Sequence, residues 1–268
     1  KYFYERRIRR LLPALSFVML ASFPIAWLYL PPSQLVEFSK SILYSLGFSS
    51  NFYFHFSGLN YNAWEGLFVP FLHSWSLSVE EQYYILFPAF FFIIFKYFRK
   101  LILPFLIFSF VISLMMAEFW NKSHPSSTFY FIHTRIWELS AGAILAYLEI
   151  KRGHRCNDQL LNLIFSIIGL FLIGLSFIKI FNHDTPHPSL YTLIPVIGVC
   201  LIIWFSNKKI IVTNLLSSKI FVGIGLISYS LYLWHYPIFS FAKISGLVSG
   251  SFKFKILLAI LTLAISII

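Results

Sequence analysis

Long apolar runs, separated by short polar and basic segments, recur along the whole chain. A helix needs about 20 apolar residues to cross a bilayer, within a range of roughly 17–25. The pattern therefore predicts membrane-spanning helices at residues 11–30, 81–96, 101–118, 135–149, 160–180, 190–206, 219–242 and 255–268. The expected fold class is all-α, a polytopic helical bundle with about eight transmembrane helices. The spans at 81–96 and 135–149 reach the required length only if their polar leading ends lie inside the membrane region.

Residues 31–80, between the first two spans, form the longest loop, and within it residues 35–66 are rich in Ser, Asn, Phe and Tyr. This segment is apolar only in patches, so we interpret it as interfacial or re-entrant. The remaining loops support that interpretation, because the basic ones alternate with the others only if 35–66 does not cross. The positive-inside rule then places the basic loops in the cytoplasm and 31–80 on the outer side.

The chain is 58% hydrophobic and only 12% charged, about half the charged fraction of a soluble domain. It has no room for a separate soluble domain. The net charge of +11 follows membrane topology, so no nucleic-acid partner is expected. Cys156 and Cys200 fit neither a disulfide nor a metal site. Because the chain starts at Lys1 and stops within an apolar run, we expect a single transmembrane domain over 1–268, truncated at both ends.

The stretch HSWSLSVEEQYY, at 73–84, places two acids where an apolar run begins. Ser78 and Glu81 have the spacing of a capping box, which accounts for Glu81 but not for Glu80. On a helix, Glu80 would share a stripe with His73, Leu77 and Tyr84. Glu80 is therefore either a solvated first-turn acid, favoured by the helix dipole, or a functional group.

Two further segments combine charge or imidazole with apolar surroundings. Arg135 and Glu138 either pair with each other, at i,i+3, or face the same polar cavity as Glu80. Gly142 and its small neighbours would allow close helix packing. In ISYSLYLWHYPIF, a lone His235 is more often a satisfied structural group than a base. The stripe of Ser228, Tyr229, Ser230 and Tyr232 is nevertheless unusually polar.

The segment ERRIRR carries four arginines beside a predicted membrane face, namely Arg6, Arg7, Arg9 and Arg10. Such a cluster binds either lipid headgroups or phosphates, since guanidinium groups form bidentate hydrogen bonds to phosphate. The sequence contains no glycine-rich phosphate loop, zinc-protease motif or nucleophile elbow.

Four segments, in this order, resemble the membrane acyltransferase-3 family: RRIRRLLPAL at 6–15, HSWSLSVEEQYYILFP at 73–88, RIWELSAGAILAY at 135–147 and ISYSLYLWHYPI at 227–238. The resemblance covers essentially the whole chain. It is closest to the branch that modifies bacterial surface polysaccharides, often with an SGNH-type domain fused at the C-terminus.

The resemblance implies transfer of an acyl group, usually acetyl, from cytoplasmic acyl-CoA to hydroxyls of O-antigen, capsule, lipooligosaccharide or peptidoglycan. The expected location is the bacterial cytoplasmic (inner) membrane, with acetyl-CoA as donor and no metal. The family's R-x-x-R element maps onto Arg7 and Arg10, with Arg6 and Arg9 as an overlapping copy, and suits the CoA phosphates. Its S-L-x-x-E element maps onto Ser76, Leu77 and Glu80. We expect His73, Glu80, Arg135 and Glu138 to support catalysis, with a cavity lined by Trp75, Ser76, Tyr84, Tyr232 and His235.

The sequence departs from the family in one respect. Family members carry their favoured catalytic His, with an Arg, in a first transmembrane helix, and they usually have ten or more spans. No such helix precedes Lys1, so we expect the first two spans to be missing and these residues alone to be inactive. The expected partners are acyl-CoA, a surface polysaccharide or lipid-linked glycan, the bilayer, and a fused or separate SGNH domain. The competing interpretations are a flippase or transporter for lipid-linked sugars, which needs no thioester, and a structural partner in an envelope complex.

Overall fold

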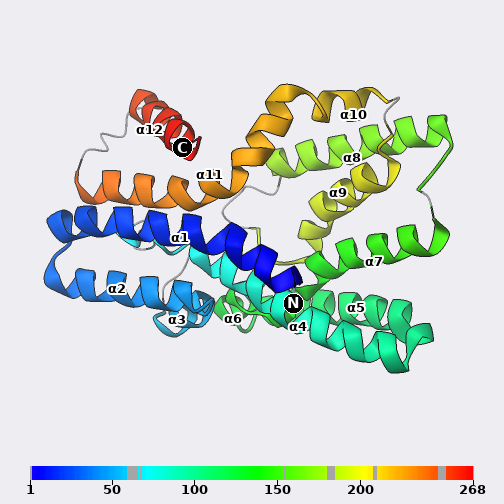
Figure 1. Cartoon of the computed structure of the whole chain (residues 1–268), viewed down its shortest axis with the longest axis horizontal. Coiled ribbons are helices and arrows are strands. Elements are labelled where there is room, and N and C mark those ends of the chain that lie inside the picture. The colour runs from blue at the N-terminus through cyan, green and yellow to red at the C-terminus, as the bar shows by residue number, and fades with distance from the viewer. Residues whose placement is uncertain are drawn as a thin grey trace. The chain divides into compact units, whose positions relative to one another are not determined.

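The computed structural model describes residues 2–58, 66, 68–153, 155–179, 185–207, 210–246 and 252–267, which form helices joined by turns, with no strand among them (Figure 1). The chain divides into two compact units. Unit 1 comprises residues 1–81 and 223–268, and unit 2 comprises residues 82–222. The α-helices are α1 (Tyr2–Tyr29), α2 (Pro32–Leu46), α3 (Ser50–Phe56), α4 (Ser74–Tyr97), α5 (Ile102–Asn121), α6 (Pro125–Tyr130), α7 (Ile136–Arg152), α8 (Gln159–Lys179), α9 (Leu193–Phe205), α10 (Ile211–Leu216), α11 (Lys219–Ile244) and α12 (Phe252–Ser266). All eight predicted spans coincide with helices, which confirms the all-α fold class.

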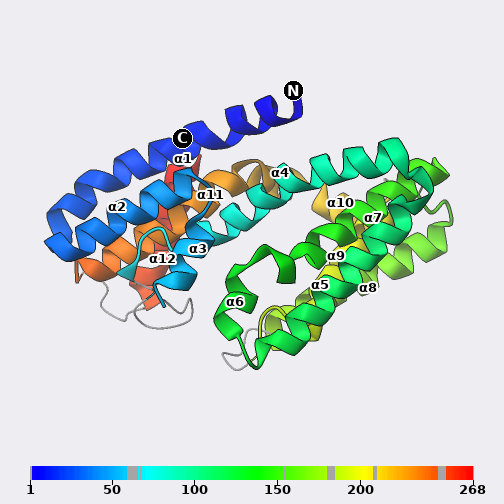
Figure 2. The ribbon, with the colours of Figure 1, turned by 90° about the horizontal axis from the view of Figure 1, so that it is seen from below.

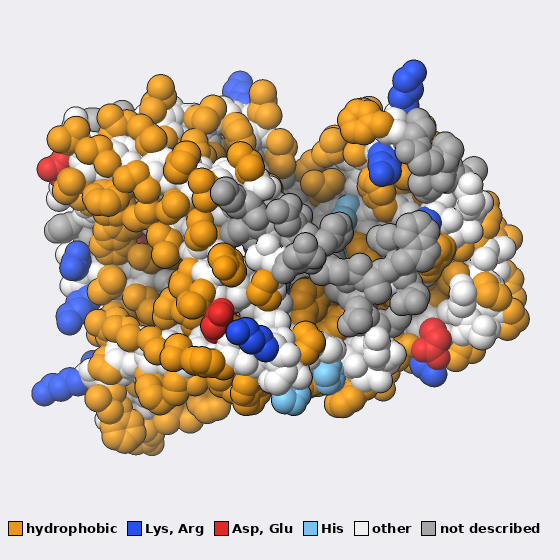
Figure 3. Space-filling model, turned by 180° about the vertical axis from the view of Figure 1, so that it is seen from behind, with side chains coloured by type: hydrophobic (Ala, Val, Ile, Leu, Met, Phe, Trp, Pro, Cys, Tyr) orange, Lys and Arg blue, Asp and Glu red, His pale blue; other side chains and the backbone are white. Residues whose placement is uncertain are grey.

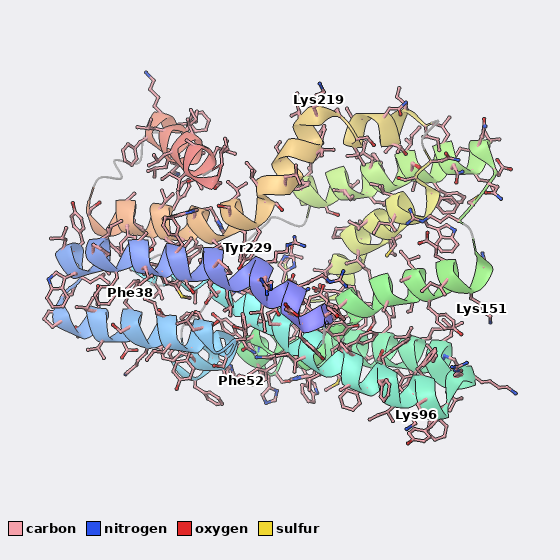
Figure 4. All side chains as sticks on the ribbon, viewed as in Figure 1. Phe38, Phe52, Lys96, Lys151, Lys219 and Tyr229 are labelled. Carbon is pink, nitrogen blue, oxygen red and sulfur yellow. The ribbon has the colours of Figure 1, made fainter. Side chains whose placement is uncertain are left out.

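In unit 1, α1 and α11 run side by side in the same direction, as a series of contacts along both helices shows. The Tyr229 hydroxyl donates a hydrogen bond to the Leu11 carbonyl (3.0 Å), and further along both helices the rings of Phe17 and Trp234 meet at 6.2 Å. The buried ring of Phe38, from α2, packs between α1 and α2 in Figure 4 and touches Phe241 of α11. Aromatic contacts therefore join all three helices to one another.

The helix α2 follows a Pro–Pro pair, in which Pro32 suits the first helical turn because proline has no N–H to leave unsatisfied. It then runs back along α1 (Figures 1 and 2). Its 15 residues measure about 22 Å, which is shorter than the roughly 30 Å hydrocarbon core. Of the two interpretations of 35–66, the re-entrant one is favoured, because a helix that follows α1 inward does not lie flat at the surface. Part of that range, 59–65 and 67, lies outside the described residues.

Unit 2 is organised around two helix pairs. Between α8 and α9, Gly169 and Gly198 meet so closely that a Cβ on either would lie 2.7–2.8 Å from the other's carbonyl oxygen. Between α5 and α7, Trp137 is completely buried, and the Ser113 hydroxyl accepts a hydrogen bond from its backbone N–H (3.1 Å). Gly142 has no neighbour within 4 Å of a Cβ placed on it, so the prediction that it mediates close packing is wrong.

The loops of unit 2 gather at two opposite ends, as the charge pattern predicted. At one end, the Arg155 guanidinium donates to the Ile203 carbonyl (2.8 Å), and Lys96 and Lys151 end their helices on the same side in Figure 4. At the other end, the Asn121 side chain donates to the Pro188 carbonyl (2.9 Å). Basic loops and polar loops are thus separated within this unit, although which end faces the cytoplasm stays a prediction.

Four of the described helices are long and apolar enough to cross a membrane: Tyr2–Tyr29, Ser74–Tyr97, Arg99–Asn121, which includes the turn before α5, and Gln159–Ile178. Large apolar side chains are exposed along them, and hydrophobic atoms cover most of the face seen in Figure 3. Exposed apolar patches of this extent mark contact with lipid or protein. The spanning role of the other four predicted segments stays a prediction.

Candidate functional site

The stretch HSWSLSVEEQYY begins α4 earlier than predicted, at Ser74. Its first turns are tied to α2 and α3 by buried serines, since the Ser74 hydroxyl bonds the hydroxyls of Ser45 (2.6 Å) and Ser50 (3.0 Å), and Ser78 bonds that of Ser50 (2.8 Å). Buried hydroxyls are stable only when hydrogen-bonded, so this network fixes the position of α4. Ser78 lies inside the helix with Ser50 as its partner, and the predicted capping box is wrong.

Glu81, which the capping box had accounted for, instead binds Arg7 of α1. The Arg7 guanidinium donates two hydrogen bonds to the carboxylate, one from Nε at 3.3 Å and a shorter one from Nη2. The Glu81 side chain is 8% exposed and that of Arg7 is 26% exposed. Bidentate pairing of this kind is the strongest form of the Arg–carboxylate contact.

This ion pair corrects the predicted membrane topology. The charge pattern placed the arginines at the inner face and the start of the second span at the outer face, across a core roughly 30 Å thick. Because Arg7 and Glu81 are in direct contact, both lie at the same end of α1. The sequence pattern failed here because α2 returns the chain along α1 before α4 begins.

The four arginines lie within the first turns of α1 and have different partners. Arg9 pairs with Glu5 (3.0 Å), and Arg6 donates to the Tyr2 carbonyl (3.3 Å). Arg10 is exposed and forms no ion pair within the described part of the chain. Of the four arginines, Arg10 therefore suits a phosphate ligand best. The two residues of the predicted pair differ, because Arg7 binds Glu81 within the protein and Arg10 is exposed to a ligand.

The Tyr229 side chain of α11 lies close to the ion pair of Arg7 and Glu81. Besides its hydrogen bond to the Leu11 carbonyl, it is within electrostatic range of Arg7, Arg10, Glu80 and Glu81. Glu80 itself is exposed on α4. A carboxylate, a guanidinium and a phenol from α4, α1 and α11 thus meet at the arginine end of unit 1.

His73 precedes α4 and is 2% exposed, enclosed by three rings of α11. The ring centroids of Tyr232, His235 and Tyr236 lie 5.1–5.3 Å from that of His73. Within the described residues, the nitrogens of His73 form no hydrogen bond of good geometry, although the backbone carbonyls of Leu233 and Pro70 lie near the ring. Burial, and secondarily His235, hold the pKa of His73 well below its usual range, against the opposing effect of the Leu233 and Pro70 carbonyls. His73 is therefore a neutral imidazole in an aromatic enclosure, with two backbone carbonyls nearby.

Three of the predicted cavity residues, Ser76, Tyr232 and His235, lie around that imidazole. The Tyr232 hydroxyl donates to the His73 carbonyl (2.5 Å) and shares a hydrogen bond with the Ser76 hydroxyl (2.8 Å). Tyr232 and His235 also line a groove of about 440 Å³ between α11 and α12. The structure thus brings His73, Ser76, Tyr232 and His235 together, while Trp75 is buried in the same turn of α4. His73 does not share a stripe with Glu80, because one is buried and the other exposed.

Arg135 and Glu138 belong to unit 2, where they bind each other at 3.1 Å. The self-satisfied pair is therefore the alternative that the structure supports. Tyr84 also belongs to unit 2 and is half-buried beside Tyr83. A cavity shared by these residues with Glu80 stays a prediction. No group of His, Cys, Asp or Glu suited to a metal ion occurs in the described ranges, and Cys156 and Cys200 are free thiols.

The sequence matches a family model along its whole length and known proteins over about nine tenths of it. The family model described as "acyltransferase domain" matches residues 1–268. The chain belongs to the acyltransferase-3 family. It is 30% identical to the peptidoglycan O-acetyltransferase OatA of Listeria monocytogenes over 255 residues, covering 89% of this chain and 40% of that protein. It is 32% identical to the provisionally named peptidoglycan O-acetyltransferase YrhL of Bacillus subtilis over 248 residues, covering 88% of this chain and 39% of that protein.

A Staphylococcus aureus protein provisionally named as an O-acetyltransferase is 29% identical over 250 residues, covering 90% of this chain and 41% of that protein. The chain thus spans about two fifths of the length of these curated relatives. No solved structure matches it. Sequence reasoning did not predict that Glu81 binds Arg7 or that Tyr236 packs on His73. Both contacts join segments that are distant in the sequence, and residue spacing along one helix does not reveal them.

Proposed function

We propose that this chain is the membrane domain of an O-acyltransferase that moves an acetyl group from cytoplasmic acetyl-CoA to hydroxyls of a surface polysaccharide, with peptidoglycan as the first candidate. The family match over all 268 residues carries the proposal. The names of two relatives, which specify peptidoglycan, support the choice of acceptor. The predicted location is the cytoplasmic membrane, in several passes.

In the proposed reaction, a glycan hydroxyl attacks the thioester carbonyl, directly or through an acyl-enzyme intermediate. A C–O bond forms and the C–S bond breaks. The base that takes the hydroxyl proton returns it to the departing sulfur, so that CoA leaves as the thiol. The family resemblance assigns the base to a His outside these 268 residues. Glu80 would orient that imidazole and stabilise its protonated form, as carboxylates do for catalytic histidines.

Arg10 would hold a phosphate of CoA, because it is exposed and forms no ion pair among the described residues. Arg6 and Arg9 would contribute after exchanging their local contacts for the phosphate. Arg7 would act by positioning α4 through Glu81. With Glu80 on the same turn as Glu81, the proposed chemistry lies close to the donor end of α1.

The test uses membranes containing the protein with every segment that accompanies these residues in the cell. Labelled acetyl-CoA is supplied on the cytoplasmic side, and label on outer-surface carbohydrate is counted for wild type, Glu80→Gln and Glu149→Gln. Glu149 provides a matched control, as an exposed acid paired with Arg155 in unit 2. Label that requires Glu80 but not Glu149 supports acyl transfer and the role of Glu80. Label unaffected by Glu80→Gln removes that role, and absence of label from acetyl-CoA and longer acyl-CoAs contradicts the proposed function.

A further inference from the structure

The end of unit 1 away from the arginines contains a pocket of about 390 Å³, within the size range of small-molecule sites. It is formed where α1 ends, α2 begins, and α3 and the turn at 68–70 close over them. Its lining combines buried apolar residues with an exposed polar rim: Leu30, Phe38 and Pro70 inside, Gln34, Glu37 and Ser57 at the edge.

The carboxylate of Glu37 is held at the rim by two donors. Lys40 donates a hydrogen bond at 2.8 Å, and the Tyr53 hydroxyl donates a shorter one. The hydrogen bond from Lys40, and secondarily that from Tyr53, hold the pKa of the Glu37 carboxyl below its usual range. Glu37 is therefore ionised at neutral pH, and its side chain is 56% exposed, which leaves oxygen lone pairs available to a ligand.

Aromatic faces complete the pocket. Tyr53 stacks on Tyr44 at 4.8 Å, which fixes its ring, and Phe68, which also lines the pocket, lies under the ammonium of Lys243 (4.8 Å). The neighbouring turn is anchored as well, because the Tyr236 hydroxyl donates to the Gly66 carbonyl (3.0 Å). The aromatic walls are thus held in place before any ligand binds.

The position of the pocket fits an acceptor on the outer side. Leu30 is 23 residues beyond Arg7 on or directly after α1, which corresponds to about 35 Å of helix. If the arginine end faces the cytoplasm, as the positive-inside rule predicts, the pocket opens toward the outer side. Its wall at Pro70 also continues directly into the turn that carries His73, and Phe71 of that turn packs on Phe38 at 5.7 Å.

We propose that this pocket binds a neutral pyranose residue of the acceptor glycan. A pyranose offers an apolar face of C–H groups, which suits Phe68 and Tyr53, and a rim of hydroxyls, which suits Glu37 and Gln34. A phosphate-bearing ligand fits less well, because Glu37 is the only charged residue among the described residues that line the pocket. This assignment rests on the proposed function, and it concerns a sugar residue of the acceptor strand away from the one that is acylated, because Glu80 lies at the arginine end of α1 and the pocket at the other end.

The experiment measures binding of a neutral disaccharide probe, the peptidoglycan GlcNAc–MurNAc unit with its lactyl carboxyl amidated, to the protein in lipid nanodiscs. Glu37→Gln and Gln34→Ala are compared with wild type, and Glu149→Gln is the matched control. Glu37 and Gln34 are exposed, so the folded state is expected to survive both changes. Loss of a charge-assisted hydrogen bond should raise Kd about tenfold for Glu37→Gln, and less for Gln34→Ala, with no change for Glu149→Gln.

Acetyl transfer to a peptidoglycan strand of several disaccharides, long enough to reach from the pocket to Glu80, then separates the two proposals. Glu37→Gln should raise KM for the strand without changing KM for acetyl-CoA. Disaccharide binding that depends on Glu37, in a protein that transfers no acetyl group, would keep the pocket and contradict the proposed function. Acetyl transfer with a disaccharide Kd that neither pocket variant changes would keep the function and overturn the pocket assignment.

Discussion

Arg7 and Glu81, 74 positions apart in the sequence, form a bidentate and largely buried ion pair that joins α1 to α4. Removing one partner leaves the other charge without compensation, which costs about 3–5 kcal/mol for a fully buried pair and less here because Arg7 is partly exposed. We expect Arg7→Gln and Glu81→Gln each to lower the thermal unfolding midpoint in detergent. The exchange of both residues, Arg7→Glu with Glu81→Arg, should recover part of the loss.

The exposed pair of Arg9 and Glu5 provides the comparison for that experiment. It lies on the same helix, but both side chains are well exposed to solvent. Exposed pairs contribute about 0.2–1 kcal/mol, so Glu5→Gln should leave the midpoint almost unchanged. Equal effects of Glu5→Gln and Glu81→Gln would contradict the structural importance of the link between α1 and α4.

The arginines should differ in their effect on donor binding. Arg10→Gln should raise KM for acetyl-CoA by about tenfold or more, because Arg10 forms no ion pair among the described residues and a phosphate contact costs roughly 1.5–3 kcal/mol to lose. Arg9→Gln should have a smaller effect, since Arg9 already pairs with Glu5. Initial rates at varied acetyl-CoA concentration measure both, and the opposite order of effects would assign the phosphate to Arg9.

Acidification should destabilise the protein through His73. The pKa of His73 in the folded state lies well below the ordinary 6.5, so the unfolded chain binds the proton first as the pH falls. This contribution to stability is therefore complete above pH 6.5 and declines below it. The unfolding midpoint should fall between pH 7 and pH 5.5, and His73→Phe should reduce that fall, whereas His124→Gln at an exposed position should not. Identical pH dependence in wild type and His73→Phe would contradict this prediction.

The contact between α8 and α9 should not accept a methyl group. A Cβ on Gly198 would lie 2.8 Å from the Gly169 carbonyl oxygen, so Gly198→Ala forces the helices apart and should cost about 1–3 kcal/mol. Gly174→Ala, on the same helix as Gly169 but with no neighbour within 4 Å, should have no such cost and benefit from alanine's helix propensity. Thermal unfolding of the two variants is the measurement, and equal midpoints would contradict the close approach.

Hydrophobic run lengths were sufficient to locate the helices that coincide with the eight predicted spans, because a helix that crosses lipid needs a long apolar run. The shorter helices α2, α3, α6 and α10 have no such run. Run lengths could not show that α2 turns back along α1, since its Ser and Phe positions acquire their meaning only from packing on Phe71 and Ser74. The predicted topology around Glu81 failed for that reason.

The motif HSWSLSVEEQYY identified the right region and assigned its two acids incompletely. The capping-box rule, which considers only neighbours in the sequence, predicted that Glu81 caps its own helix. In the structure, Glu81 forms an ion pair with Arg7 of another helix. The local i,i+3 rule succeeded for Arg135 and Glu138, whose partners are neighbours in sequence. The polar stripe of α11 was visible in the sequence, but the enclosure of His73 by Tyr232, His235 and Tyr236 requires the fold.

Unit 1 is assembled from both ends of this chain, with the whole of unit 2 between them in sequence. The Tyr232 hydroxyl donates a hydrogen bond to the His73 carbonyl, 159 positions away in the sequence. The Tyr229 hydroxyl donates one to the Leu11 carbonyl, 218 positions away. Such distant pairings make folding slow, because loop closure must precede the contacts that stabilise it. During synthesis, His73 and the start of α4 are therefore made before their partner α11, and the whole of unit 2 is made in between. The enclosure of His73 by α11 can form only after unit 2 has been synthesised.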